Sequence, residues 1–139
     1  MQLDATVGAS MIFAQVLYSV AWPPRILSPN SRVHWSSLAK AKRIYRHACG
    51  WATRDSLPQG GGAAHEHAVS VTLRFVAPDR RARDEDNIIA AMKAGIDGIA
   101  DGIGLDDGKI KWSYEFPRET HPGGKVLVEV SIERRKQHE

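Results

Sequence analysis

The sequence predicts a single α+β domain in which two helices pack on a mixed β-sheet, in the order β-α-β-α-β-β. Three observations indicate this class. The chain has 139 residues, which suffices for one hydrophobic core but not for two. Hydrophobic residues make up 42% of it and charged residues 25%, as in folded globular proteins. Apolar residues alternate in some segments, as in strands, and recur every three or four residues in others, as in helices.

The first part of the chain predicts a strand and then a helix. Residues 12–20 are rich in β-branched, aromatic and other apolar side chains. We expect this strand to end before the prolines at 23–24, because proline cannot continue a β-ladder. After a loop over 21–35, Ser36 or Ser37 can cap a helix with one apolar stripe and a basic remainder. The stripe consists of Leu38, Ala41, Tyr45, Ala48 and Ala52.

A second strand and a second helix follow. The glycines at 60–62 mark a loop, and the alternation of apolar and polar residues over 69–76 is typical of a half-buried strand. Apolar residues then recur every three or four positions, which predicts a helix over about 86–101. We expect Gly102 and Gly104 to end this helix.

The last part of the chain predicts two more strands. Residues 110–116 and 126–132 both alternate, and the loop 117–124 between them favours an antiparallel hairpin. The predicted elements form one domain over 1–139 with its core at about 12–133. We expect the remaining terminal residues, 1–10 and 134–139, to be flexible tails.

Charge and cysteine content narrow the classes of function. The formal net charge of +3 and the pI of about 9.2 suit a polyanionic partner, although solubility alone explains so small a bias equally well. Cys49 is the only cysteine, which excludes an internal disulfide and a zinc site built from paired cysteines. We expect it to be a packing residue in a reducing compartment. Residues 11–22 lack a basic leader and contain Gln15, so neither an export signal nor a membrane span is expected.

Two pairs of acids are candidate metal ligands. Asp84 and Asp86 crowd the start of the second helix, and carboxylates so close repel each other unless a cation such as magnesium or manganese holds them. Asp106 and Asp107 follow the end of that helix, so the chain must turn back before they can approach the first pair. The alternative is that the first pair caps the helix and the second forms a turn. We do not expect an EF-hand calcium loop, because Ile89 stands where its glycine is required.

Lys93 has two interpretations. It lies seven residues beyond Asp86, close to two helical turns, so both side chains project from nearly the same face. It could therefore face a phosphate, but an ion pair with Asp97, four residues further on, is the interpretation that spacing alone favours. The sequence His-Glu-His at 65–67 resembles a fragment of a metal site without a further ligand at a recognisable interval. We expect it to be an exposed strand entry.

Together these motifs resemble the RusA family of Holliday-junction resolvases over about residues 12–133. The family consists of small dimeric nucleases, common in phages and prophages, that cut four-way DNA junctions with magnesium or manganese. The resemblance implies a homodimeric, magnesium-dependent endodeoxyribonuclease of a bacterial cytoplasm, phage- or prophage-encoded, acting in DNA recombination or repair. The motifs that carry it are Trp22-Pro23-Pro24, Pro78-Asp79-Arg80-Arg81-Ala82-Arg83-Asp84-Glu85-Asp86-Asn87, Lys93-Ala94-Gly95-Ile96-Asp97-Gly98-Ile99 and Leu105-Asp106-Asp107.

The resemblance also assigns roles to residues. It implies that Asp84, Asp86 and Asp107 are the catalytic acids and metal ligands, with Asp106 as an adjacent acid that could assist. Lys93 matches the functional lysine of the family if three residues are inserted before it. A carboxylate-held cation can activate water and offset charge in phosphodiester hydrolysis, and Lys93 would steady the pentacovalent phosphate.

Several basic residues are candidates for contacts with the DNA backbone, each with solvation or pairing to a nearby acid as the alternative. They are Arg80, Arg81, Arg83, Lys40 and Arg43. Gly95 and Gly98 can permit close helix packing, as at a dimer interface. Four tryptophans could stack on DNA bases, but their spacing favours the core. They are Trp22, Trp35, Trp51 and Trp112.

Two other classes of function stay open at this point. A DNA-binding protein of the same fold could use the arginines without turnover. A metal-dependent phosphohydrolase acting on nucleotides could use the aspartates without preferring branched DNA.

Overall fold

The computed structural model describes residues 11–58 and 67–134 of the chain, and confirms the α+β class and the order β-α-β-α-β-β. Three predicted segments lie outside the described residues: the glycine run, the first two residues of the His-Glu-His segment, and the terminal tails. Arg134, which was predicted to belong to the C-terminal tail, is instead the last residue of β4. Two short 3₁₀ turns, η2 (Arg25–Leu27) and η5 (Asp107–Lys109), complete the structure. The main elements are β1 (Met11–Ala21), α1 (Trp35–Ser56), β2 (His67–Val76), α2 (Glu85–Ile103), β3 (Ile110–Glu115) and β4 (Lys125–Arg134).

The four strands form one sheet in the order β1-β4-β2-β3. β4 runs antiparallel to both β1 and β2, whereas β3 lies parallel to β2 at the edge of the sheet. The predicted hairpin of the last two strands is therefore wrong. Helix α2 makes β2 and β3 a parallel crossover unit, so β3 takes one side of β2 and β4 must pair on the other. A β-bridge between Ala77 and Thr120 fixes the segment that leads from β3 to β4 against the end of β2.

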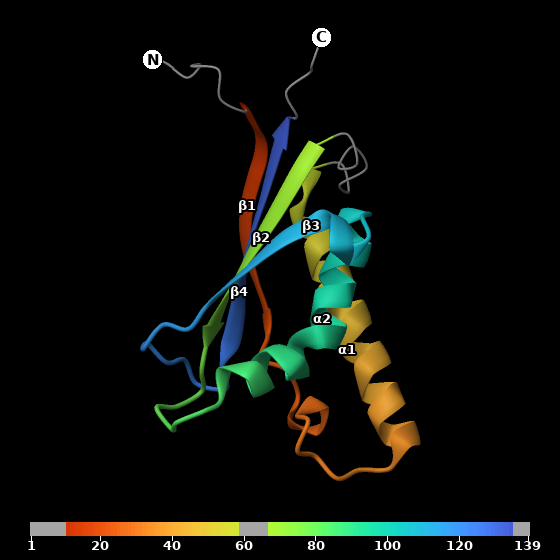
Figure 1. Cartoon of the computed structure of the whole chain (residues 1–139), viewed down its shortest axis with the longest axis vertical. Coiled ribbons are helices and arrows are strands. Elements are labelled where there is room, and N and C mark those ends of the chain that lie inside the picture. Colours follow the sequence, from red (N-terminus) through yellow and green to blue (C-terminus); the bar gives the residue numbers. More distant parts are fainter. Residues whose placement is uncertain (1–10, 59–66, 135–139) are drawn as a thin grey trace.

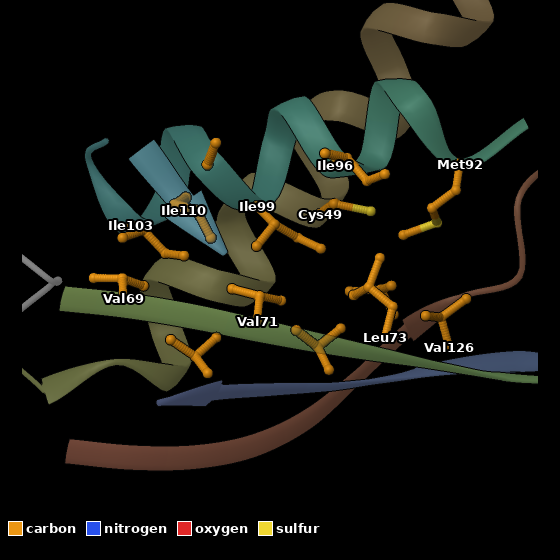
Figure 2. Packing of buried hydrophobic residues seen from close by; sticks show 14 of the residues in the cluster. Cys49, Val69, Val71, Leu73, Met92, Ile96, Ile99, Ile103, Ile110 and Val126 are labelled. Carbon is orange, nitrogen blue, oxygen red and sulfur yellow. The ribbon is translucent and has the colours of Figure 1, made fainter. Parts of the chain in front are cut away.

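Both helices lie on one side of the sheet (Figure 1). The alternation predicted for β2 is confirmed, since Val69, Val71, Leu73 and Phe75 are all buried. Figure 2 shows Val69, Val71 and Leu73 meeting the buried residues of α2, near Cys49 of α1. Burial raises the pKa of the Cys49 thiol to about 11, which fits the expected packing role rather than a nucleophile. Among the described residues, no helix is long and apolar enough to cross a membrane.

The contact between α1 and α2 depends on glycine. A Cβ at Gly98 would lie 2.1 Å from the carbonyl oxygen of Arg46, and one at Gly102 would lie 2.6 Å from that of Gly50. The close packing expected at Gly98 is therefore with α1 of the same chain. Gly102 does not end the helix as predicted, because it is part of this contact; only Gly104, with φ 91°, terminates α2.

The structure corrects three details of α1. The helix starts earlier than predicted, since the His34 ring accepts a hydrogen bond from the Ser36 backbone N–H at 3.2 Å and so forms the cap. Ala48 of the predicted stripe is exposed, because the buried line continues through Cys49. Trp35 and Trp51 are not core residues, since they are 74% and 62% exposed.

Candidate functional site

The start of α2 is built from the predicted acidic segment. Asp84 is the N-cap, and its side chain accepts a hydrogen bond from the backbone N–H of Asp86 at 2.9 Å. The capping interpretation is thus correct for Asp84. Glu85 and Asp86 occupy the first turn, where the helix dipole favours negative charge. One carboxylate oxygen of Asp84 thus accepts the capping hydrogen bond, while Asp86 is exposed at the surface.

Arg83 organises the loop before this helix. Its guanidinium pairs with Asp79 at 2.9 Å, donates to the carbonyls of Asp79 and Arg81 at 3.1 Å, and lies 5.9 Å from the ring centre of Trp22. Asp79 also accepts from the Arg81 backbone N–H, and this bond, followed by Arg83, lowers the pKa of the Asp79 carboxyl. The Arg83 side chain is only 17% exposed. It therefore holds the loop, whereas Arg80 and Arg81 extend from it into solvent.

Lys93 joins two predicted site segments. Its ammonium donates to Asp97 at 2.9 Å and to Asp107 at 2.8 Å, so the expected pair with Asp97 exists but is only half of the arrangement. Both bonds raise the pKa of Lys93, Asp107 more strongly, and Lys93 in turn lowers the pKa of Asp107. Both groups are therefore charged across the neutral pH range. Fourteen residues of chain separate Lys93 from Asp107, so only the folded chain brings them together.

The turn that carries Asp107 is fixed by backbone contacts. The Asp106 carbonyl accepts from the Lys109 N–H at 2.9 Å, which closes the 3₁₀ turn η5. The indole of Trp112 donates to the Asp107 carbonyl at 3.0 Å and anchors the turn to β3. A cavity of about 450 Å³ opens beside it, lined among others by Lys93, Asp107 and Tyr114. The bond from Trp112 to this turn and the place of Tyr114 in the cavity lining were not predicted, although alternation on the strand right after Asp107 placed both residues on one face.

The predicted metal ligands do not gather in one place. Asp86 and Lys93 are seven residues apart on the same helix, which corresponds to roughly 10 Å along its axis, and Asp107 lies at the Lys93 end. Within residues 11–58 and 67–134, no three or more His, Cys, Asp or Glu side chains are grouped so as to hold a metal ion. Carboxylate oxygens suit magnesium, but Asp84 and Asp86 form one acidic place and Asp106 and Asp107 another.

The two predicted DNA-contact residues of α1, Lys40 and Arg43, do not line the same surface. A groove of about 840 Å³ runs between η2, α1 and α2, and both Arg43 and Lys93 line it, whereas Lys40 does not. Lys42 and His47 also line this groove and were missed as site residues, although they lie in the same basic stretch of sequence. Arg46 is committed to Asp101 of α2 through two bonds of 2.7 and 3.0 Å.

Among known proteins, one relative is similar enough to this chain to show a shared family. No family model matches the chain. A solved structure, 2C-methyl-D-erythritol 2,4-cyclodiphosphate synthase from Plasmodium vivax, covers 93% of this chain and 100% of its own at 11% identity, but the TM-score of 0.35 is too low to support an argument. An uncharacterized protein of Xylella fastidiosa (strain Temecula1 / ATCC 700964) is 31% identical over 113 residues, which are 81% of this chain and 74% of that protein. The chain therefore belongs to the same family as this Xylella fastidiosa protein.

Proposed function

We propose that the protein is an endonuclease that cuts four-way DNA junctions, as the resemblance to RusA resolvases implies. The observation that carries the proposal is the contact of Lys93 with Asp107. The resemblance names both residues, they come from separate segments, and they share an ion pair of 2.8 Å at the edge of a cavity. A capped helix and an unrelated turn do not require such a contact.

The chemistry of this pair suits a phosphodiester substrate. Lys93 is 61% exposed on its side chain, so its ammonium can reach a phosphate oxygen and offset the charge that develops during hydrolysis. Asp107, whose pKa Lys93 lowers, stays ionised and holds the ammonium in position. Magnesium or manganese, held by carboxylates of the predicted set, would supply an activated water and further charge neutralisation. The acids of the predicted set lie in two separate places. The proposal therefore requires the ion without assigning it to either place, and the cleavage assay with and without magnesium tests that requirement.

The substrate and the assembly follow from the same proposal. Arg80, Arg81 and Arg43 would contact DNA phosphates, and binding should weaken steeply with salt. Two active sites related by a twofold axis are needed to cut a nearly twofold junction in paired fashion, so the active form is a homodimer. We place this activity in the cytoplasm of a bacterial cell, in a protein of phage or prophage type.

The test is cleavage of an end-labelled synthetic four-way junction with and without magnesium. We expect paired nicks that chelation abolishes, and losses of at least about 100-fold in Lys93→Gln and Asp107→Asn. Lys111→Gln and Asp55→Asn are matched controls, since neither residue lines the cavity of Lys93 and Asp107 and Lys111 alternates with Trp112 on β3, and both variants should cut normally. If Asp86→Asn kept near-normal magnesium-dependent nicking, the assignment of the acids would be wrong. Sedimentation of the active protein as a monomer would contradict paired incision.

A second candidate is a DNA-binding protein of this fold without catalysis. The separation of the two acidic places favours it, because among the described residues no three-acid group forms. It predicts tight and salt-sensitive junction binding with no nicking at any magnesium or manganese concentration. The same labelled junction distinguishes the two candidates.

A further inference from the structure

A separate cavity of about 610 Å³ lies between the first turn of α2 and the residues that follow β2 and β3. Its volume is in the range of small-ligand sites. None of the four predicted metal ligands lines it. The cavity is therefore distinct from the one at Lys93 and Asp107.

Aromatic rings form one wall of this cavity. Phe116 stacks on Phe75, with ring centres 5.2 Å apart and planes at 14°, and Trp22 meets Phe75 edge-on at 6.2 Å. Phe75 is buried at 2% exposure and supports the stack from behind. Phe116 is half-buried, so part of its ring stays open to the cavity. Another flat ring can therefore stack on it.

Three arginines stand at the rim. Arg80, Arg81 and Arg118 all line the cavity and are exposed, and in the described part of the chain none of their side chains forms an ion pair. Arg83 lines it as well but pairs with Asp79, and Glu85 and Glu119 are the other acids of the lining. Four arginines therefore face three acids, which leaves an excess of one positive charge. Guanidinium groups bind phosphate through paired hydrogen bonds.

The combination of wall and rim defines the ligand. An apolar ligand would leave the arginines without partners, and inorganic phosphate would leave the aromatic wall uncovered. A base inside a duplex already has both faces stacked, so it cannot use the Phe116 ring. An unstacked nucleotide presents a free base and a phosphate together.

We propose that this cavity holds one unstacked nucleotide of a DNA strand, with its base against Phe116 and its phosphate on the arginine rim. The inference rests on the proposed function and deepens it, since in an open four-way junction the bases at the exchange point lack a stacking neighbour on one face. Glu85 and Ile88 of the cavity belong to the first turn of α2, beside Asp84 and Asp86. A strand seated here would continue past these acids.

The experiment measures binding of a fluorescein-labelled thymidine pentanucleotide to the full chain by anisotropy, in EDTA so that no cleavage occurs. We expect Phe116→Ala to weaken binding by about 5- to 150-fold, the usual range for one lost base stack. Phe116→Tyr should restore it, and Trp51→Ala, which removes an exposed ring of α1, should not change it. Arg118→Ala should weaken binding and flatten its salt dependence by about 0.7 in the logarithmic slope, whereas Arg32→Ala should do neither.

Defined outcomes would overturn this inference. Equal affinities of the parent chain, Phe116→Ala and Arg118→Ala contradict it, and the exposed Arg118 keeps the test valid if Phe116→Ala fails to fold. Thymidine monophosphate that competes as well as the pentanucleotide would show a free-nucleotide site instead of a strand site. Phe116-dependent binding without junction cleavage would contradict only the proposed function. Junction cleavage without Phe116-dependent binding would contradict only the nucleotide cavity.

Discussion

Helix α2 carries two neighbouring stripes that the structure uses in opposite ways. Gly95, Gly98 and Gly102 form one stripe and face α1 so closely that a methyl group has no room. Lys93 and Asp97 lie on the other stripe and pair at the surface, where Lys93 also reaches Asp107. The first stripe sets the distance between the helices. The second stripe contributes little to that packing, which leaves its charges available for chemistry.

Under the proposed function, this difference separates stability from function along a single helix. A buried backbone contact tolerates no added volume, because neither helix can move without disturbing the sheet beneath it. An exposed ion pair is screened by water and changes the free energy of unfolding only slightly. Substitutions on the two stripes should therefore give contrasting results.

The largest effect is expected from Gly98→Ala. Its Cβ would lie 2.1 Å from the Arg46 carbonyl oxygen, so α1 and α2 must separate, and the free energy of unfolding should fall by about 3 kcal/mol. Urea unfolding followed by circular dichroism measures it. Gly108→Ala is the control, since its Cβ would meet only Asp106 at 3.7 Å and should change stability by less than about 0.5 kcal/mol. Equal stability of the two variants would disprove the tight crossing.

A smaller loss is expected from Thr53→Val, on the buried side of α1. The Thr53 hydroxyl donates to the Cys49 carbonyl at 2.8 Å, so its oxygen accepts from the Tyr18 hydroxyl at 2.5 Å. Valine leaves Tyr18 without this partner, which should cost about 1–2 kcal/mol in thermal or urea unfolding. The double variant with Tyr18→Phe should lose less than the sum of the single losses. Strict additivity would count against this bond.

The ion pair between the helices should contribute less and depend on pH. Arg46 lowers the pKa of Asp101, so the stabilisation is present above the usual carboxyl pKa near 4 and is lost as pH falls through the lowered value. We expect Asp101→Asn to cost about 0.5 kcal/mol at pH 7, because both side chains are about half exposed. Urea unfolding from pH 7 to 2 should show this difference shrinking in acid. A difference that grows in acid would mean that folding raises the pKa of Asp101 instead of lowering it.

The smallest effect on stability is expected from Lys93→Gln. Both of its ion pairs are at the surface, so the free energy of unfolding should change by less than about 0.5 kcal/mol while junction cleavage is lost. Urea unfolding and the cleavage assay are run on the same preparation. A large loss of stability would mean that Lys93 holds the turn of Asp107 rather than serving chemistry.

Much of the architecture was predictable because it depends on local patterns. The alternation over β2 and the three- and four-residue repeat over α2 each bury one face, so element type and order followed from spacing alone. The capping role of Asp84 was also open to local reasoning. The hairpin prediction failed because β3 pairs with one edge of β2 and β4 pairs with the other edge. Local spacing does not show which strands share an edge. In the proposed nucleotide cavity, no sequence signal joins Phe116 and Arg118 to the predicted Arg80 and Arg81.

The sequence by itself determined the class of the fold, the two acidic places and the basic segments, since each is written in adjacent residues or in a short period. Only the tertiary structure decided which of them meet. It brought Lys93 to Asp107 across fourteen residues, kept Asp86 about two helical turns away, and used Arg83 to hold a loop. Such contacts depend on how the helix lies over the sheet and where the chain turns back. Spacing along the chain does not encode these distances.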